Sequence, residues 1–281
     1  MDKDGACGRT ASGAPENARD SRRMDSIWKR MKEEKGESLL VTKFSASLDS
    51  EVSIQRAYYA ATAARYDEMH GGEAQDSFAI AFFLAAVDYL GIRSILDVGA
   101  GTGFALLLLK EKRPDVTAVG IEPAEGLRRI GYAKGLSEHD LIAGDAMNLQ
   151  FEDASFDLVC EFGVLHHIPD PSRAVSDMLR VACKGVLISD CNNFGMGGRF
   201  SRFLKQTIHA LGLWPLADLI KTRGKAYTMS EGDGLAYSYS VFDNYRQIAR
   251  ECKSVRMMAT NGSGPNLYRS AGHVTLLALK K

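Results

Sequence analysis

The sequence predicts an α/β fold in which helices cover both faces of a mostly parallel β-sheet. Short, almost continuous apolar runs recur through the middle of the chain, and stretches with helical periodicity separate them. Such runs are typical of parallel strands that are buried on both faces. The chain has 281 residues, of which 45% are hydrophobic, and this suits one large domain.

Helices are expected before the first strand. Residues 1–50 lack sustained periodicity and are rich in small and charged residues, so we expect a flexible tail ahead of a domain over residues 51–281. Two amphipathic patterns predict helices over residues 51–69 and 74–90, and the second is expected to stop at Gly91.

Strands and helices then alternate to the end of the chain. The expected strands are residues 93–98, 116–121, 140–143, 156–161, 185–190, 255–260 and 273–279. A well-marked helix begins with Asp170 as its N-cap and Pro171 in its first turn, and it should run to the glycine at 185. Another helix is expected over residues 241–252. The last two strands are joined by a loop, which suggests an antiparallel edge to the sheet.

The first strand runs into a glycine-rich turn within "ILDVGAGTGFALLLL". Its glycines, Gly99, Gly101 and Gly103, allow a ligand to approach the backbone closely, and the helix that begins near Phe104 directs N–H groups toward negative charge. The dinucleotide fingerprint has the order G-x-G-x-x-G, whereas this chain has phenylalanine at the sixth position. The pattern therefore argues against a rival function, that of an NAD-dependent oxidoreductase.

Two acidic residues end the next two strands. Glu122 ends "VTAVGIE" and follows the glycines by the spacing at which a carboxylate accepts hydrogen bonds from ribose hydroxyls. Asp145 lies in "LIAGDAMNL", where its carboxylate could accept from an adenine amino group. A glycine loop followed by these two acids describes a site for an adenosine-containing ligand.

In this order the motifs resemble the class I S-adenosylmethionine-dependent methyltransferases. The resemblance extends over roughly residues 54–192 and rests on "YYAATAARYDEMHG", "ILDVGAGTG", "AVGIEP", "IAGDAMNLQFEDASFDLVCEFGVLHHIPDP" and "GVLISD". It implies S-adenosylmethionine as cofactor and a seven-stranded sheet of order 3-2-1-4-5-7-6 with strand 7 antiparallel. The residues that it implies for the cofactor are Tyr66, Asp97, Gly99, Ala100, Gly101, Gly103, Glu122, Pro123, Asp145 and Ala146.

Methyl transfer from a sulfonium is an in-line displacement, so the enzyme acts mainly by positioning a nucleophile in a water-poor pocket. A hydroxyl nucleophile benefits from a base, and His166 and His167 in "EFGVLHHIPDP" are the candidates. In the resembling family such a pair more often shapes the cofactor pocket, and both roles stay open. Oxygen-bearing side chains follow strands four and five, but they match a Mg²⁺ site poorly and no metal is expected; they are Glu161, Asp190, Asn192 and Asn193.

Residues 194–239 form an insertion that is expected to be helical and to act as a lid over the acceptor. Asn192, Tyr237 and Tyr239 are expected to face the acceptor. Between Phe194 and Tyr227 there are six Lys or Arg against one acid, so peripheral membrane contact through residues 198–225 is an alternative, and a core helix with a solvated charged face is another.

The sequence thus predicts an enzyme that methylates a small molecule, with oxygen the expected acceptor atom and nitrogen or carbon left open. The alternatives are a non-catalytic S-adenosylmethionine-binding module and an enzyme acting on a lipid or macromolecule. Thirty-five basic residues balance thirty-five acidic ones, which argues against nucleic acid as a partner. The five cysteines are expected to be free thiols in a cytoplasmic protein, a monomer or homodimer.

Overall fold

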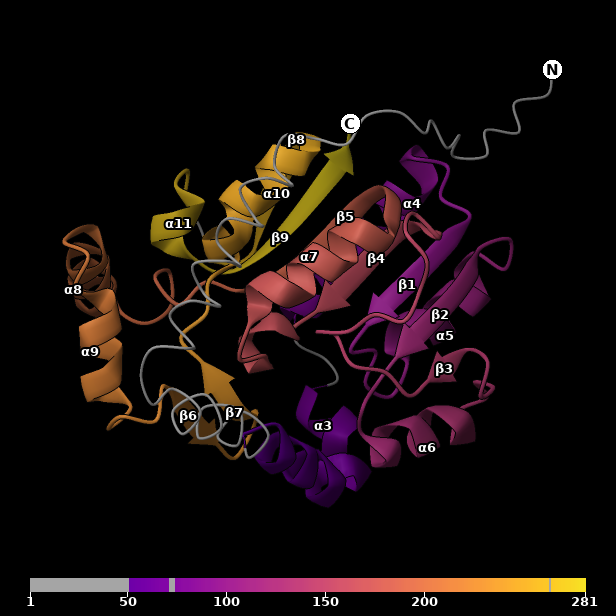
Figure 1. Ribbon diagram of the computed structural model, residues 1–281, viewed down its shortest axis with the longest axis horizontal. Helices are drawn as coiled ribbons and strands as arrows, with labels where there is room; N and C mark the ends of the chain where they lie inside the picture. The colour runs from indigo at the N-terminus through magenta and orange to yellow at the C-terminus, as the bar shows by residue number, and fades with distance from the viewer. Residues whose placement is uncertain (1–50, 71–73, 263) are drawn as a thin grey trace, which may run out of the picture. The chain divides into compact units, whose positions relative to one another are not determined.

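The structure is a computed structural model, and it describes residues 51–70, 74–262 and 264–281. The chain divides into two units, Met1–Ser53 and Ile54–Lys281, and the sheet and the helices named below lie in the second unit, except for residues 51–53 of the first helix (Figure 1). The flexible tail predicted for residues 1–50 lies outside the described residues.

A seven-stranded sheet forms the centre of the second unit, in the order β3-β2-β1-β4-β5-β9-β8 (Figure 1). Its strands are β1 (Ser94–Val98), β2 (Thr117–Ile121), β3 (Leu141–Ile142), β4 (Phe156–Phe162), β5 (Ala182–Cys191), β8 (Cys252–Gly262) and β9 (Ala271–Lys280). The first five pair in parallel, whereas β9 runs antiparallel to both of its neighbours. The predicted order, with its antiparallel seventh strand, is confirmed.

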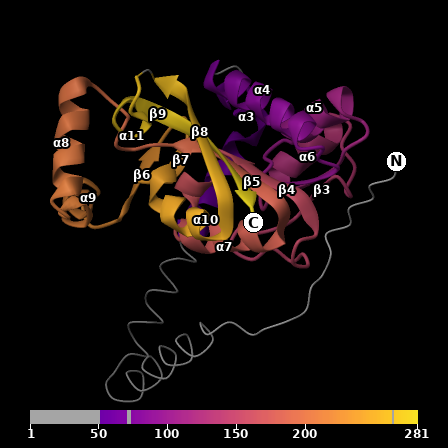
Figure 2. The ribbon, with the colours of Figure 1, turned by 90° about the horizontal axis from the view of Figure 1, so that it is seen from above.

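Helices cover both faces of this sheet, as predicted. They include a helix over residues 51–62, η1 (Ala63–Arg65), α3 (Tyr66–His70), α4 (Ala74–Tyr89), α5 (Phe104–Lys112), α6 (Glu125–Ala133), η2 (Leu165–His167), α7 (Pro171–Val181), η3 (Val241–Asn244), α10 (Tyr245–Glu251) and α11 (Leu267–Ser270). Figure 2 shows α4 and α5 on the opposite side of the sheet from α7 and α10. None of the helices over the described residues has the length and apolarity that a membrane-spanning helix needs.

Helix α7 begins as predicted but ends sooner than predicted. The Asp170 side chain caps its first turn by accepting a backbone hydrogen bond. The helix stops at Val181, and β5 begins at Ala182 because this residue already pairs with Phe156 of β4. The glycine at 185, predicted as the helix stop, therefore lies inside the strand.

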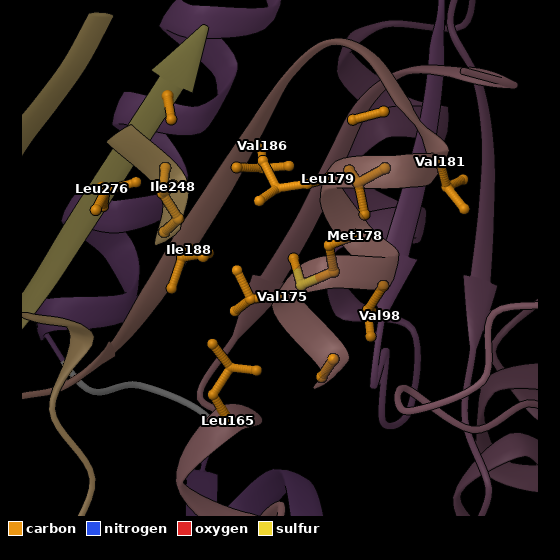
Figure 3. Packing of buried hydrophobic residues seen from close by; sticks show 14 of the residues in the cluster. Val98, Leu165, Val175, Met178, Leu179, Val181, Val186, Ile188, Ile248 and Leu276 are labelled. Carbon is orange, nitrogen blue, oxygen red and sulfur yellow. The ribbon is translucent and has the colours of Figure 1, made fainter. Parts of the chain in front are cut away.

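The largest hydrophobic cluster lies between α7 and the sheet. Figure 3 shows Val175, Met178 and Leu179 of α7 directed toward Val98 of β1 and Val186 of β5. All five side chains are fully buried. Because α7 follows η2 directly, this packing also fixes the position of the two histidines of η2.

The insertion after β5 is helical only in its first half. It contains α8 (Arg199–Ala210), α9 (Trp214–Lys221) and then a hairpin of β6 (Tyr227–Ser230) and β7 (Gly234–Tyr237). The helical insertion predicted for residues 194–239 thus has its helices, α8 and α9, but it ends in a hairpin that the prediction did not include. The physical reason is the "EGDG" turn, in which Gly234 has a φ of +72° and reverses the chain between two short strands.

Replacement of Met178 by alanine tests the core. Removing a fully buried thioether leaves a cavity, so Met178→Ala should lower the free energy of unfolding by about 2–5 kcal/mol in urea denaturation. Arg173→Ala, at an exposed position of the same helix, should change it by less than about 0.5 kcal/mol. Equal effects of the two substitutions would contradict the packing of α7 described above.

Candidate cofactor and acceptor site

The glycine loop is a tight turn that only glycine can adopt at three positions. Gly99, Gly101 and Gly103 have φ angles of +73°, +56° and +79°. A Cβ on Gly99 would lie 2.5 Å from Val164 Cγ2, so the neighbouring chain leaves no room for a side chain. The N–H groups of Gly99 and of the following alanine both donate to Ile121 O at 2.9 Å, which fixes the loop to the end of β2.

Four carboxylates are buried at or beside the carboxyl ends of neighbouring parallel strands. Asp97 (β1), Glu122 (after β2), Glu161 (β4) and Asp190 (β5) have exposed fractions of 3%, 5%, 0% and 0%. Burial raises the pKa of Asp97 to about 7, although the Cys160 thiol that donates to it opposes this rise. Burial also raises the pKa of Glu122 and of Glu161. This edge of the sheet therefore favours a positively charged ligand.

Glu122 connects the glycine loop to the start of α6. Its Oε2 accepts a hydrogen bond from Gly101 N at 3.1 Å, and its Oε1 accepts one from Ala124 N at 2.7 Å. These bonds partly oppose the effect of burial on its pKa. Each carboxylate oxygen retains a further lone pair, so the side chain can still accept from two hydroxyl groups.

A cavity of about 1060 Å³ lies beside this edge of the sheet. Its wall includes predicted cofactor residues, namely Tyr66, Asp97, Gly99 and Ala100, and also both predicted histidines, His166 and His167. The structure thus brings these two groups together. The remaining predicted cofactor residues are outside the described wall of this cavity; they are Gly101, Gly103, Glu122, Pro123, Asp145 and Ala146.

Asp145 has partners of its own. Its Oδ1 accepts a hydrogen bond from Met147 N at 2.9 Å, which closes the turn after β3. Its Oδ2 is 3.8 Å from Arg56 Nη2, and both side chains are about half exposed. The exposed pair contributes little stability, so it is easily exchanged for a ligand contact.

His166 lies between two carboxylates. Its Nδ1 is 2.7 Å from Asp190 Oδ1, and its Nε2 is 3.3 Å from Asp233 Oδ2. Burial lowers the pKa of His166, but the two carboxylates outweigh this effect and raise the pKa well above its usual value. The imidazole is therefore charged near neutral pH in this arrangement, and a charged imidazole cannot accept a proton.

The predicted acceptor residues lie in supporting positions. Asn192 is fully buried, and its Nδ2 donates to Ala271 O at 2.9 Å. Tyr239 is 4% exposed, and its hydroxyl donates to Asn244 Oδ1 at 3.0 Å. Tyr237 lies in β7, and none of the three predicted residues lines the described cavity.

Other residues that the sequence did not indicate line the acceptor side. Asp233 comes from the turn of the hairpin, Arg202 from α8, and His273 from β9. Burial lowers the pKa of His273, so its imidazole is neutral near pH 7, and its Nδ1 is 2.6 Å from Thr260 Oγ1. These residues belong to no common motif, since only the folded chain brings their elements together.

Comparison with known proteins is consistent with this geometry. Residues 96–189 match a family model described as a methyltransferase domain. The chain is 32% identical over 169 residues to a demethylmenaquinone methyltransferase of Roseiflexus castenholzii, which covers 56% of this chain and 65% of that protein. It is 33% identical to an ajmaline N-methyltransferase of Rauvolfia serpentina over 34% of each chain. The chain thus spans less than two thirds of the length of these curated relatives.

Solved structures share the fold. A magnesium protoporphyrin IX methyltransferase of Synechocystis PCC 6803 with bound S-adenosylmethionine has a TM-score of 0.53 and 15% identity, and it covers 82% of this chain and 97% of that one. An S-adenosylmethionine-dependent methyltransferase of Thermotoga maritima has a TM-score of 0.51 and 18% identity, covering 80% and 99%. The fold is therefore that of an α/β methyltransferase.

Residues 96–189 thus match a methyltransferase domain, and the fold is that of solved S-adenosylmethionine-dependent methyltransferases, in agreement with the resemblance read from the motifs. The residues present fit the family's cofactor. S-Adenosylmethionine carries a positive sulfonium and a positive ammonium group, and the buried carboxylates at the strand ends match both in charge. The three glycines of the loop carry no side chains, so the methionine part of the cofactor can approach the backbone there.

The pKa of Asp97 predicts how cofactor affinity depends on pH. An ammonium group beside Asp97 requires the ionised carboxylate, which is the minor form below a pKa of about 7. Affinity for S-adenosylhomocysteine, measured by calorimetry, should therefore rise by about tenfold between pH 6 and pH 8. Asp97→Asn should bind more weakly and lose this rise. A pH dependence that persists in the variant would show that another group causes it.

Proposed function

We propose that this chain transfers the methyl group of S-adenosylmethionine to a small-molecule acceptor, with S-adenosylhomocysteine as the second product. The row of buried carboxylates at the ends of β1, β2, β4 and β5 carries this proposal, because it suits a cofactor with two cationic groups. The same buried carboxylates would repel the anionic pyrophosphate of NAD. This argues against the rival function of an NAD-dependent oxidoreductase.

The reaction that we propose is an in-line displacement controlled by position. The cavity of about 1060 Å³ is large enough for the methionine end of the cofactor together with an acceptor. For an oxygen acceptor, the neutral His273 is our candidate to take the proton. His166 is charged in the arrangement described above, so it lines the cavity without being a candidate for this base, and His167 lines the cavity beside it.

An apolar, ring-bearing acceptor is the class that we favour. The cavity wall carries Tyr59, Phe104, Phe162 and Met196, which provide apolar contact for a flat ring. The relatives named as demethylmenaquinone methyltransferases act on a molecule of this kind according to their names. A non-catalytic cofactor-binding module remains the competing proposal.

We also propose that α8 and α9 contact an anionic membrane, from which an apolar acceptor would enter. Large apolar side chains are exposed on this pair; they are Phe200, Phe203, Leu204, Leu211, Leu213, Leu216, Leu219 and Ile220. Basic residues accompany them; they are Arg199, Arg202, Lys205, Lys221, Arg223 and Lys225. An apolar face beside basic side chains is typical of helices that lie in a membrane interface.

A methyl-labelling assay tests the enzymatic proposal. Purified protein is incubated with methyl-labelled S-adenosylmethionine and an extract separated into small-molecule, lipid and macromolecular fractions. Label should appear in the small-molecule or lipid fraction, and Glu122→Ala should lose it, whereas Glu125→Ala, an exposed acid of α6, should retain it. Cofactor binding with no label in any fraction would favour the binding module.

Sedimentation with vesicles tests the membrane contact. The protein should sediment with vesicles that contain phosphatidylglycerol and less with neutral vesicles, and added salt should weaken the interaction. Phe200→Ser combined with Phe203→Ser should abolish sedimentation, whereas Tyr89→Ser, which alters an exposed aromatic residue of α4, should not. Equal sedimentation of the two variants would exclude α8 as the contact surface.

A further inference from the structure

Three side chains with metal-binding atoms meet in the wall of the cavity. His166 and His167 come from η2, and Asp233 comes from the turn between β6 and β7. One atom from each of the three lies within 4.8 Å of the others. The exposed fractions of the histidine side chains are 14% and 10%, so they are largely removed from solvent.

Both imidazoles are held so that Nε2 is directed at the same carboxylate. His166 Nδ1 is 2.7 Å from Asp190 Oδ1, and His167 Nδ1 is 2.6 Å from Leu235 O. A carbonyl oxygen can only accept, so the 2.6 Å contact, shorter than the 3.3 Å contact with Gln55 Nε2, assigns a hydrogen to His167 Nδ1. Its Nε2 is then the nitrogen that faces Asp233 and that can bind an ion through its lone pair. A second hydrogen bond of this kind, to a carboxylate or a backbone carbonyl, is what orients metal-binding histidines.

The distances to Asp233 are those of ligands on one ion. His166 Nε2 is 3.3 Å from Asp233 Oδ2, and His167 Nε2 is 3.3 Å from Asp233 Oδ1. A hydrogen bond between ionised partners is usually shorter, about 2.7–2.9 Å. Two ligands on a tetrahedral ion with bonds of about 2.0–2.1 Å are separated by about 3.3–3.4 Å.

We propose that His166, His167 and Asp233 bind a divalent transition-metal ion, with Zn²⁺ the best match to two imidazoles and one carboxylate. The ion takes the place of the proton that His166 Nε2 carries in the metal-free protein, so binding releases a proton. Three protein ligands leave a fourth position, which faces the cavity. No metal is expected from the sequence, because the oxygen-bearing side chains after strands four and five match a Mg²⁺ site poorly. One of these side chains, Asn192, donates hydrogen bonds to backbone carbonyl groups. Asp233 is 67 residues from His166 in the sequence, and only the fold brings the two together.

A second group of potential ligands nearby suits a metal less well. It consists of His166, Asp190 and Cys191. The oxygens of Asp190 already accept hydrogen bonds from the backbone N–H groups of His166 and Cys191. Asp190 is therefore better placed to orient His166 than to bind the ion itself.

This site deepens the proposed function and rests on it for its chemical role. A hydroxyl or enol oxygen of the acceptor takes the fourth position, and the ion lowers the pKa of that group. Its proton passes to a base in the cavity, the oxygen forms a bond to the methyl carbon, and the bond between that carbon and sulfur breaks with its electron pair on sulfur. The acceptor class is thus an alcohol, phenol or enol.

The test is a metal titration of the full chain, purified without a histidine tag and treated with a chelator. Calorimetry with ZnSO₄, in the absence of cofactor, should give one ion per chain. Asp233→Asn and His167→Gln should each weaken binding by at least about tenfold, whereas His139→Gln, at an exposed position of a loop, should not. Co²⁺ in place of Zn²⁺ should give the intense visible absorption of a tetrahedral site, and Asp233→Asn should lose it.

Two results would overturn the site. One is the lack of binding by the unaltered protein, and the other is equal binding by Asp233→Asn, with circular dichroism showing that the variant is folded. The methyl-labelling assay separates this failure from failure of the proposed function. If labelled product forms in the presence of chelator and no metal binds, the proposed enzymatic function is supported and the proposed metal site is rejected.

Discussion

The burial of four carboxylates at the carboxyl edge of one sheet is the constraint on which the site depends. The strand order places β1, β2, β4 and β5 side by side, so Asp97, Glu122, Glu161 and Asp190 approach one another where the covering helices exclude water. Buried negative charge is costly unless protons, hydrogen-bond donors or cations compensate it. Each contributes here: burial raises the pKa of Asp97 to about 7, backbone N–H groups donate to Glu122, and His166 faces Asp190. The cationic groups of the proposed cofactor would add to this compensation.

The cavity combines two parts of the chain that have different roles. The glycine loop and the strand ends belong to the α/β domain, in which packing around α7 keeps positions fixed. The acceptor side depends on the insertion, because Asp233 reaches the two histidines from a hairpin turn. The conformation of the hairpin is therefore coupled to the charge of His166. Removal of Asp233 would take away one of the two carboxylates that raise the pKa of this histidine.

Local patterns in the sequence predicted the parts of the fold that depend on local chemistry. The apolar runs located the strands, Asp170 marked the start of α7, and the glycine spacing located a turn in which three positive φ angles occur. The hairpin was missed because each of its strands has only four residues, too few for a clear periodic pattern. The cavity residues Asp233 and His273 were missed because tertiary contacts alone bring them to the histidines. A strand end also does not reveal which way a side chain points, and Asn192 points into the protein.

A crystal structure with bound S-adenosylhomocysteine tests the central claim most directly. The account predicts that the ribose hydroxyls contact Glu122, that the adenine lies at the turn containing Asp145, and that the sulfur faces the cavity wall formed by His166 and His167. A ligand bound away from the carboxyl ends of β1 and β2, with Glu122 making no contact to it, would contradict the account.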